Sequence, residues 1–128
     1  MSNCKCECSA APKLIFSCSG AADVGELADR SARLLTKNGT GKMFCLSGIG
    51  GRISGILKST EVADDILAID GCTLNCALKT LQEAGFSNVK HIQLGDLGFK
   101  KGNSPVNESS IEEVTQHAAR MLTEGLTK

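Results

Sequence analysis

Apolar residues along this chain fall into four short continuous runs separated by longer amphipathic stretches. The runs are "KLIFSCSG" (13–20), "GKMFCLSGIGG" (41–51), "DDILAIDG" (64–71) and "NVKHIQLGDLG" (88–98), and each ends in glycine. Continuous apolar runs of this length that end in turn residues are typical of buried strands. The sequence therefore predicts four strands.

Between and after these runs, apolar positions recur at helical spacing. Gly39 and Gly85 stand where two such stretches end, and glycine is the preferred residue just past a helix C-terminus. Near the end of the chain, Ser109 or Ser110 is the expected N-cap of a last helix. We therefore expect helices within 21–39, 52–60 and 73–85, and from Ser109 or Ser110 through Leu122.

Four strand-then-helix units in succession predict a parallel sheet, because parallel strands need crossover connections and helices provide them. The expected fold is an α/β three-layer sandwich with a four-stranded parallel sheet. We favour the flavodoxin-like strand order 2-1-3-4, with the Rossmann-like order 3-2-1-4 as the alternative. The sandwich is expected to form a single domain over residues 13–128, preceded by a polar tail over residues 1–12 that we expect to have little order.

Composition narrows the classes of function. The chain has 128 residues, 41% of them hydrophobic, which is enough for one domain to bury a core without disulfides. Its 14 basic and 14 acidic residues cancel, so no overall field attracts nucleic acid or a membrane surface. No apolar run reaches the roughly 18 residues of a membrane span. We expect a soluble cytoplasmic protein whose partner, a protein or a small molecule, is left open.

Seven cysteines are many for such a chain, and in a reducing compartment they are more often metal ligands or redox groups than disulfides. Cys18 ends the first predicted strand and Cys45 lies near the end of the second. Cys72 follows the third strand, and Cys76 comes one turn into the next helix. Because the ends of parallel strands emerge at one edge of a sheet, these four sulfurs are expected to lie together.

Four thiolates at one edge are the ligand set of a closed zinc site. The spacing of Cys72 and Cys76 puts both on one side of a helix start, where the helix dipole favours thiolate. The alternative is that Cys18 and Cys45 act as small hydrophobic residues within strands. Three further cysteines alternate in "CKCEC", and they could bind a soft metal, supply ligands to the main site, or be exposed thiols of the tail: Cys4, Cys6 and Cys8.

From residue 13 onward the chain resembles the DGC-domain proteins, a family of proposed zinc-binding proteins. The segments "FSCSG", "FCLSGIGG", "IDGCTLNCALKTLQEAG" and "LGDLGFKKG" carry the resemblance, and the triplet that names the family stands here as Asp70-Gly71-Cys72. The resemblance implies zinc ligands at Cys18, Cys45, Cys72 and Cys76, the same four residues that the topology selects. It implies no substrate.

Two functions are consistent with these residues. The first is a zinc-binding protein in which the metal joins three strand ends. The second is a thiol-dependent redox or sulfur-transfer enzyme or carrier that uses the same cysteines. An intermediate case is a zinc ion with three protein ligands and one open position, which would permit Lewis-acid chemistry. Asp70 is expected either to support the site by accepting backbone hydrogen bonds from the loop that carries Cys72, or only to form a turn. His91 and His117 are interpreted as ordinary structural or surface residues.

Overall fold

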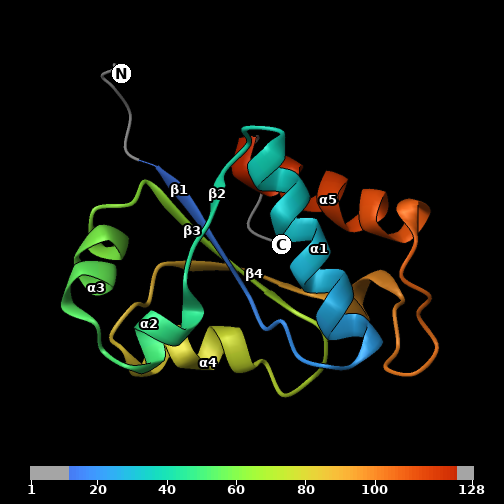
Figure 1. Cartoon of the computed structure of the whole chain (residues 1–128), viewed down its shortest axis with the longest axis horizontal. Coiled ribbons are helices and arrows are strands. Elements are labelled where there is room, and N and C mark those ends of the chain that lie inside the picture. Colours follow the sequence, from blue (N-terminus) through green and yellow to red (C-terminus); the bar gives the residue numbers. More distant parts are fainter. Residues whose placement is uncertain (1–11, 124–128) are drawn as a thin grey trace.

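The four apolar runs form one parallel sheet in the computed structural model, which describes residues 12–123 (Figure 1). The strand order is β2-β1-β3-β4, so the favoured prediction is confirmed and the Rossmann-like order is wrong. Cys4, Cys6 and Cys8, and with them the expectation of a tail of little order, lie outside the described residues. The strands are β1 (Lys13–Ser17), β2 (Lys42–Met43), β3 (Asp65–Asp70) and β4 (Val89–Gln93).

Helices cover both faces of the sheet, as expected for a three-layer sandwich (Figure 1). One face packs against α1 (Asp23–Lys37) and α5 (Glu108–Thr123). The other packs against α2 (Leu46–Gly50), α3 (Ser54–Glu61) and α4 (Cys76–Glu83). A 3-10 helix, η1 (Leu94–Leu97), continues from β4.

Strand β1 shows how the two layers arise from the sequence. Successive side chains of a strand point to opposite faces of the sheet. Ile15 accordingly belongs to the core under α1 and α5, whereas Leu14 and Phe16 belong to the core on the opposite face. All three are almost completely buried, which is why the run is continuously apolar rather than alternating.

The second predicted strand is only partly a strand. β2 has two residues, and the chain turns into α2, whose N-cap is Cys45. Helix α2 brings Ile49 into the core, where it is fully buried. Gly48 faces α3 so closely that an added Cβ would lie 2.8 Å from a carbon of Ile56. The apolar spacing that extended the strand prediction therefore belongs to a helix packed against α3.

The predicted start of the last helix is also wrong, by a few residues. Asn107 provides the cap instead of Ser109 or Ser110, because its Oδ1 accepts the amide of Ser110 at 2.9 Å. The Ser110 hydroxyl in turn accepts the amide of Asn107 at 3.1 Å. This reciprocal pair satisfies two amides at the helix start, as in a capping box. None of the helices within residues 12–123 has both the length and the apolarity that a membrane crossing requires.

Candidate functional site

Cys18 lies at the carboxyl end of β1, in contact with the loop that follows β3. Its amide donates to the carbonyl of Ile69 at 3.2 Å, so the chain is still aligned with β3 at this point. Its Sγ accepts the amide of Gly71 at 3.4 Å. The Asp70-Gly71-Cys72 segment, which we call the DGC loop, therefore begins directly against the first cysteine.

Gly71 allows the DGC loop to lie directly against the first turn of α1. A Cβ on Gly71 would lie 2.8 Å from the backbone carbonyl carbon and oxygen of Val24, in the first turn of α1. No side chain fits at that distance from a backbone, so glycine is required by packing rather than by an unusual φ angle. The contact holds the amide of Gly71 beside Cys18.

Asp70 has the most extensive hydrogen bonding in the site and is 1% exposed. Its Oδ1 accepts the amide of Ala77 at 2.7 Å, and its Oδ2 accepts the amide of Leu78 at 3.0 Å. These amides belong to the first turn of α4, so the carboxylate caps that helix from the end of β3. The amides come from α4 and not from the DGC loop itself, so Asp70 positions the helix that carries Cys76.

His91 completes the environment of Asp70. Its Nε2 lies 2.9 Å from Oδ2 of Asp70, and an ionised carboxylate can only accept in such a bond. His91 is therefore a partner of the site rather than an isolated strand residue. Its position on β4, two residues from the partner of Asp70 in the sheet register, is what brings it there.

Asn75 lies between the DGC loop and α4, immediately before the first residue of the helix. Its backbone has the left-handed conformation, with φ of 54°, and its amide donates to the carbonyl of Cys72 at 3.2 Å. Its side-chain oxygen accepts a hydrogen bond from Gln93 of β4 at 2.9 Å. Asparagine tolerates this conformation better than most residues. The segment between Cys72 and Cys76 is thus a tight turn tied to the edge strand.

A hollow of about 600 Å³ opens at this edge of the sheet. Cys18 and Cys45 both line it, together with hydroxyl-bearing residues such as Ser47 and Thr80 and apolar residues such as Phe44. Cys76 lies one turn before Thr80 on α4, and the Thr80 hydroxyl donates to its carbonyl at 2.7 Å. The hollow is therefore lined by two cysteines that follow β1 and β2 and by one residue of α4.

Two charged side chains and two hydroxyls that line the same hollow are connected by hydrogen bonds. Arg33 donates to Asp29 at 2.5 Å, Ser19 donates to the other oxygen of Asp29 at 2.8 Å, and the hydroxyls of Ser19 and Ser17 are 2.9 Å apart. Partial burial raises the pKa of Asp29, but hydrogen bonds from Arg33 and Ser19 and the charges of Arg33 and Arg30 outweigh it. The pKa of Asp29 is therefore below its ordinary value.

All four predicted ligands lie at this one edge, but they are not gathered into a closed cluster. Cys18 and Cys72 are partly buried, whereas Cys45 and Cys76 are exposed. Within residues 12–123, no three side chains of the types His, Cys, Asp and Glu are grouped closely enough to hold a metal ion. The donor types fit zinc by their chemistry, since they are four cysteines along one edge of the sheet.

The exposure of Cys45 tests the alternative that this cysteine is a small hydrophobic residue within a strand. Cys45 is exposed and lies outside β2, so it is not a small hydrophobic residue within a strand. Cys18 does contact both cores and fits that description in part. The remaining participants, His91, Asn75 and the pair Asp29–Arg33, were not identified from the sequence. Strand register could have indicated His91, and the spacing of four residues along a helix could have indicated the pair Asp29–Arg33.

Comparison with known proteins identifies relatives by sequence. A family model described as the DGC domain matches residues 14–118. The anaerobic and virulence modulator AnvM of Pseudomonas aeruginosa is 30% identical over 113 residues, which cover 88% of this chain and 86% of AnvM. No solved structure gives a significant match.

Proposed function

The chain belongs to the DGC-domain family, and on that premise we propose that it is a zinc-binding protein whose ligands are Cys18, Cys45, Cys72 and Cys76. One observation carries the proposal. The four cysteines of residues 12–123 come from three strand ends and a helix start, and all lie at the carboxyl edge of the sheet. The hydrogen bond from the DGC loop to the Cys18 sulfur brings Cys18, which follows β1, close to the loop that carries Cys72.

The residues around the cysteines have positioning roles in this proposal. Asp70 holds the start of α4 and with it Cys76, while Gly71 keeps the DGC loop against α1 and Cys18. Exposed Cys45 and Cys76 side chains can turn toward a metal without leaving a core. When bound, zinc held by four thiolates supplies a structural cross-link rather than a reactive centre.

A regulatory role is the broader part of the proposal. AnvM, which is similar over most of its length, is named as a modulator, and this name supports a role in regulation for the present chain. A zinc cross-link between strand ends suits such a role, because metal occupancy changes the stability of one edge of the domain. The proposed activity is therefore binding, not turnover.

The test combines metal analysis with a count of reactive thiols. Protein purified anaerobically should hold about one zinc per chain, and a thiol reagent should modify Cys4, Cys6 and Cys8 quickly. A strong chelator should then make the other four cysteines reactive and lower the melting temperature. Cys72→Ser and Cys76→Ser should each lose zinc, whereas the triple variant Cys4→Ser/Cys6→Ser/Cys8→Ser should keep it.

A second candidate is thiol chemistry at the same edge, and the open hollow favours it. Cys18 and Cys45 face a space of about 600 Å³, and Cys45 is exposed, as a reactive thiol must be. Protein supplied with zinc in which all seven thiols react at similar rates, with no effect of chelator, would contradict the zinc proposal. That result would support a redox or sulfur-transfer function.

A further inference from the structure

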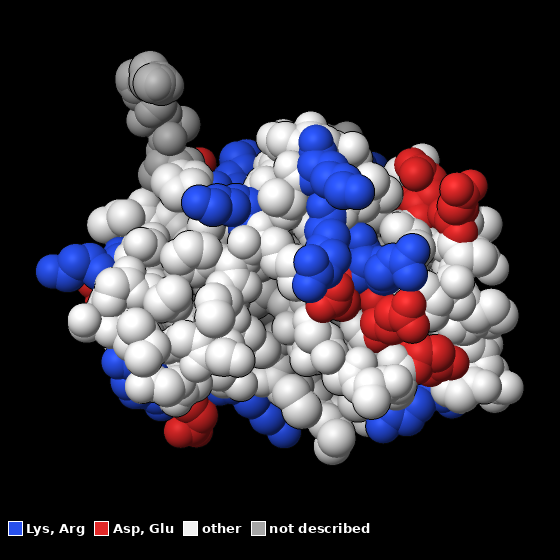
Figure 2. Space-filling view, in the orientation of Figure 1, with Lys and Arg blue, Asp and Glu red and all other residues white. Residues whose placement is uncertain are grey.

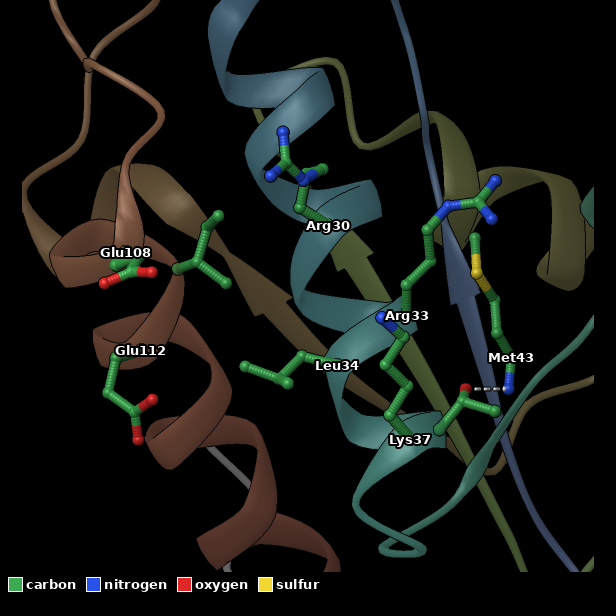
Figure 3. A pocket seen from close by; sticks show the side chains of 9 residues that line it. Arg30, Arg33, Leu34, Lys37, Met43, Glu108 and Glu112 are labelled. Carbon is green, nitrogen blue, oxygen red and sulfur yellow. Dashed lines mark hydrogen bonds between the residues drawn. The ribbon is translucent and has the colours of Figure 1, made fainter.

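A second hollow, of about 910 Å³, lies on the face of the molecule formed by α1 and α5. Figure 3 shows that the two helices run in the same direction along it, with Leu34 pointing from α1 toward α5. Arg33 extends to the opposite side, toward Met43. We call this feature the α1–α5 groove and define it by residues from the two helices: Arg30, Leu34, Lys37, Glu108, Ile111 and Glu112.

Charge is divided between the two rims of the α1–α5 groove. The α1 rim carries Arg30 and Lys37, and the α5 rim carries Glu108 and Glu112. Figure 2 shows basic side chains in a column over α1 and acidic side chains beside it. Between the rims lie the side chains of Leu34 and Ile111. The groove thus has a basic wall, an apolar floor and an acidic wall.

The charges of the rims are incompletely paired within the chain. Among residues 12–123, Lys37, Glu108 and Glu112 take part in no ion pair, although Glu112 accepts a hydrogen bond from Gln116. Arg30 pairs with Glu26 on its own helix, and both side chains are about half exposed. The rims therefore hold charge that a partner can neutralise.

We propose that the α1–α5 groove is the interface of a homodimer. A two-fold axis that runs along the groove, parallel to the two helices, places the α1 rim of each copy over the α5 rim of the other. Basic then faces acidic twice where the rims of the two copies meet. A two-fold axis across the helices would instead oppose like charges, so the charge pattern selects one arrangement.

The division of charge favours a second copy over other occupants. A uniformly acidic or basic partner would match one rim and be repelled by the other. A copy of the chain matches both at once, because an isologous interface must be complementary to itself. The 14 basic and 14 acidic residues of the chain cancel, so copies are not kept apart by net charge.

The test is sedimentation velocity of the full chain over a range of concentrations, in a reducing buffer so that disulfides do not link copies. The dimer fraction should rise with concentration and should fall between about 0.02 M and about 0.5 M salt, as the screening length shortens. Lys37→Glu alone and Glu112→Lys alone should each weaken association by about tenfold or more, because each change creates two like-charge contacts.

Mixing the two variants distinguishes contact between chains from effects within one chain. Lys37→Glu places an acidic side chain against the acidic rim of the other copy, and Glu112→Lys places a basic side chain against its basic rim. An equimolar mixture should therefore form a heterodimer that neither variant forms with itself. Lys58→Glu serves as the matched control, since Lys58 is exposed on α3 at the other face of the sheet, and this variant should dimerise like the parent.

Two results would overturn the proposal. One is a parent chain that stays monomeric at every concentration, which would leave the groove to a different occupant. The other is a dimer whose strength is unchanged in both rim variants and whose mixture gives no preferred heterodimer, which would place the contact elsewhere.

Discussion

Gly71 lies where the DGC loop meets the first turn of α1, and the space there has no room for a side chain. Gly55, on the exposed side of α3, has no atom within 4 Å of the position a Cβ would take. The two glycines have the same chemistry but different surroundings. They therefore separate the effect of packing at the site from the effect of glycine itself.

Gly71→Ala should lower the free energy of unfolding by about 1–3 kcal/mol, because the new methyl group forces the loop away from the Val24 backbone. The matched change Gly55→Ala should be neutral or stabilising by up to about 1 kcal/mol, since alanine favours a helix over glycine. Urea unfolding of both variants measures the difference. Equal stabilities would mean that the close approach of the loop to α1 is not needed.

Asp70 is the second residue on which the site depends. Asp70→Ala leaves two α4 amides and His91 without their acceptor in a buried place, which should cost about 2–4 kcal/mol. By loosening the start of α4 it should also weaken zinc binding by about 10–100-fold. A competition titration with a chromogenic chelator measures the affinity.

Asp70→Asn is the control for this prediction, because an amide oxygen can still accept from one α4 amide. It should fall between the parent and Asp70→Ala in both stability and affinity. Loss of stability with unchanged zinc affinity would show that Asp70 supports the fold alone.

At the scale of elements, the start of α1 is joined to the loop before α5 through Asp23. Its carboxylate accepts the amides of Gly102 at 2.9 Å and Ser104 at 3.0 Å, as well as that of Val24. The hydrogen bonds from Gly102 and Ser104 are the main reason that the pKa of Asp23 is below its ordinary value. This one side chain thus connects two segments some eighty residues apart.

The lowered pKa of Asp23 predicts a dependence of stability on pH. Its ionised form contributes stability at pH values above the unfolded pKa of about 3.9, and the contribution is lost as the pH falls through the lower folded pKa. Asp23→Asn should therefore have a lower melting temperature at pH 7 and a smaller fall on acidification. Asp96→Asn, at an exposed side chain without a hydrogen bond in the described chain, should follow the parent curve.

Elements whose residues repeat a clear period could be predicted, and those that depend on contacts across the fold could not. The four apolar runs predict the sheet, and cysteines at or just after the ends of three strands predict one edge, because parallel strands end together. The segment "FCLSGIGG" predicts a strand where the structure has a helix, because a short apolar run does not distinguish a strand from a buried helix. The pairing of His91 with Asp70 depends on strand register, which periodicity does not determine.

At the scale of the whole molecule, the two hollows lie at different places and have different chemistry. The smaller one is at the carboxyl edge of the sheet and contains thiols and hydroxyls. The larger one lies on the α1–α5 face and contains the divided charges. Arg33 and Met43 line both, so the proposed zinc edge and the proposed dimer face are neighbours on one molecule. Zinc content and association can nevertheless be measured independently.

Cys18, Cys45, Cys72 and Cys76 are proposed to bind one zinc ion together. X-ray absorption at the zinc edge tests it most directly, on the zinc-loaded triple variant Cys4→Ser/Cys6→Ser/Cys8→Ser, in which no other sulfur from cysteine is present. We predict that the zinc ion has about four sulfur neighbours at about 2.3 Å and no nitrogen or oxygen ligand. A shell dominated by nitrogen or oxygen at about 2.0–2.1 Å, or a variant that retains no zinc, would contradict it.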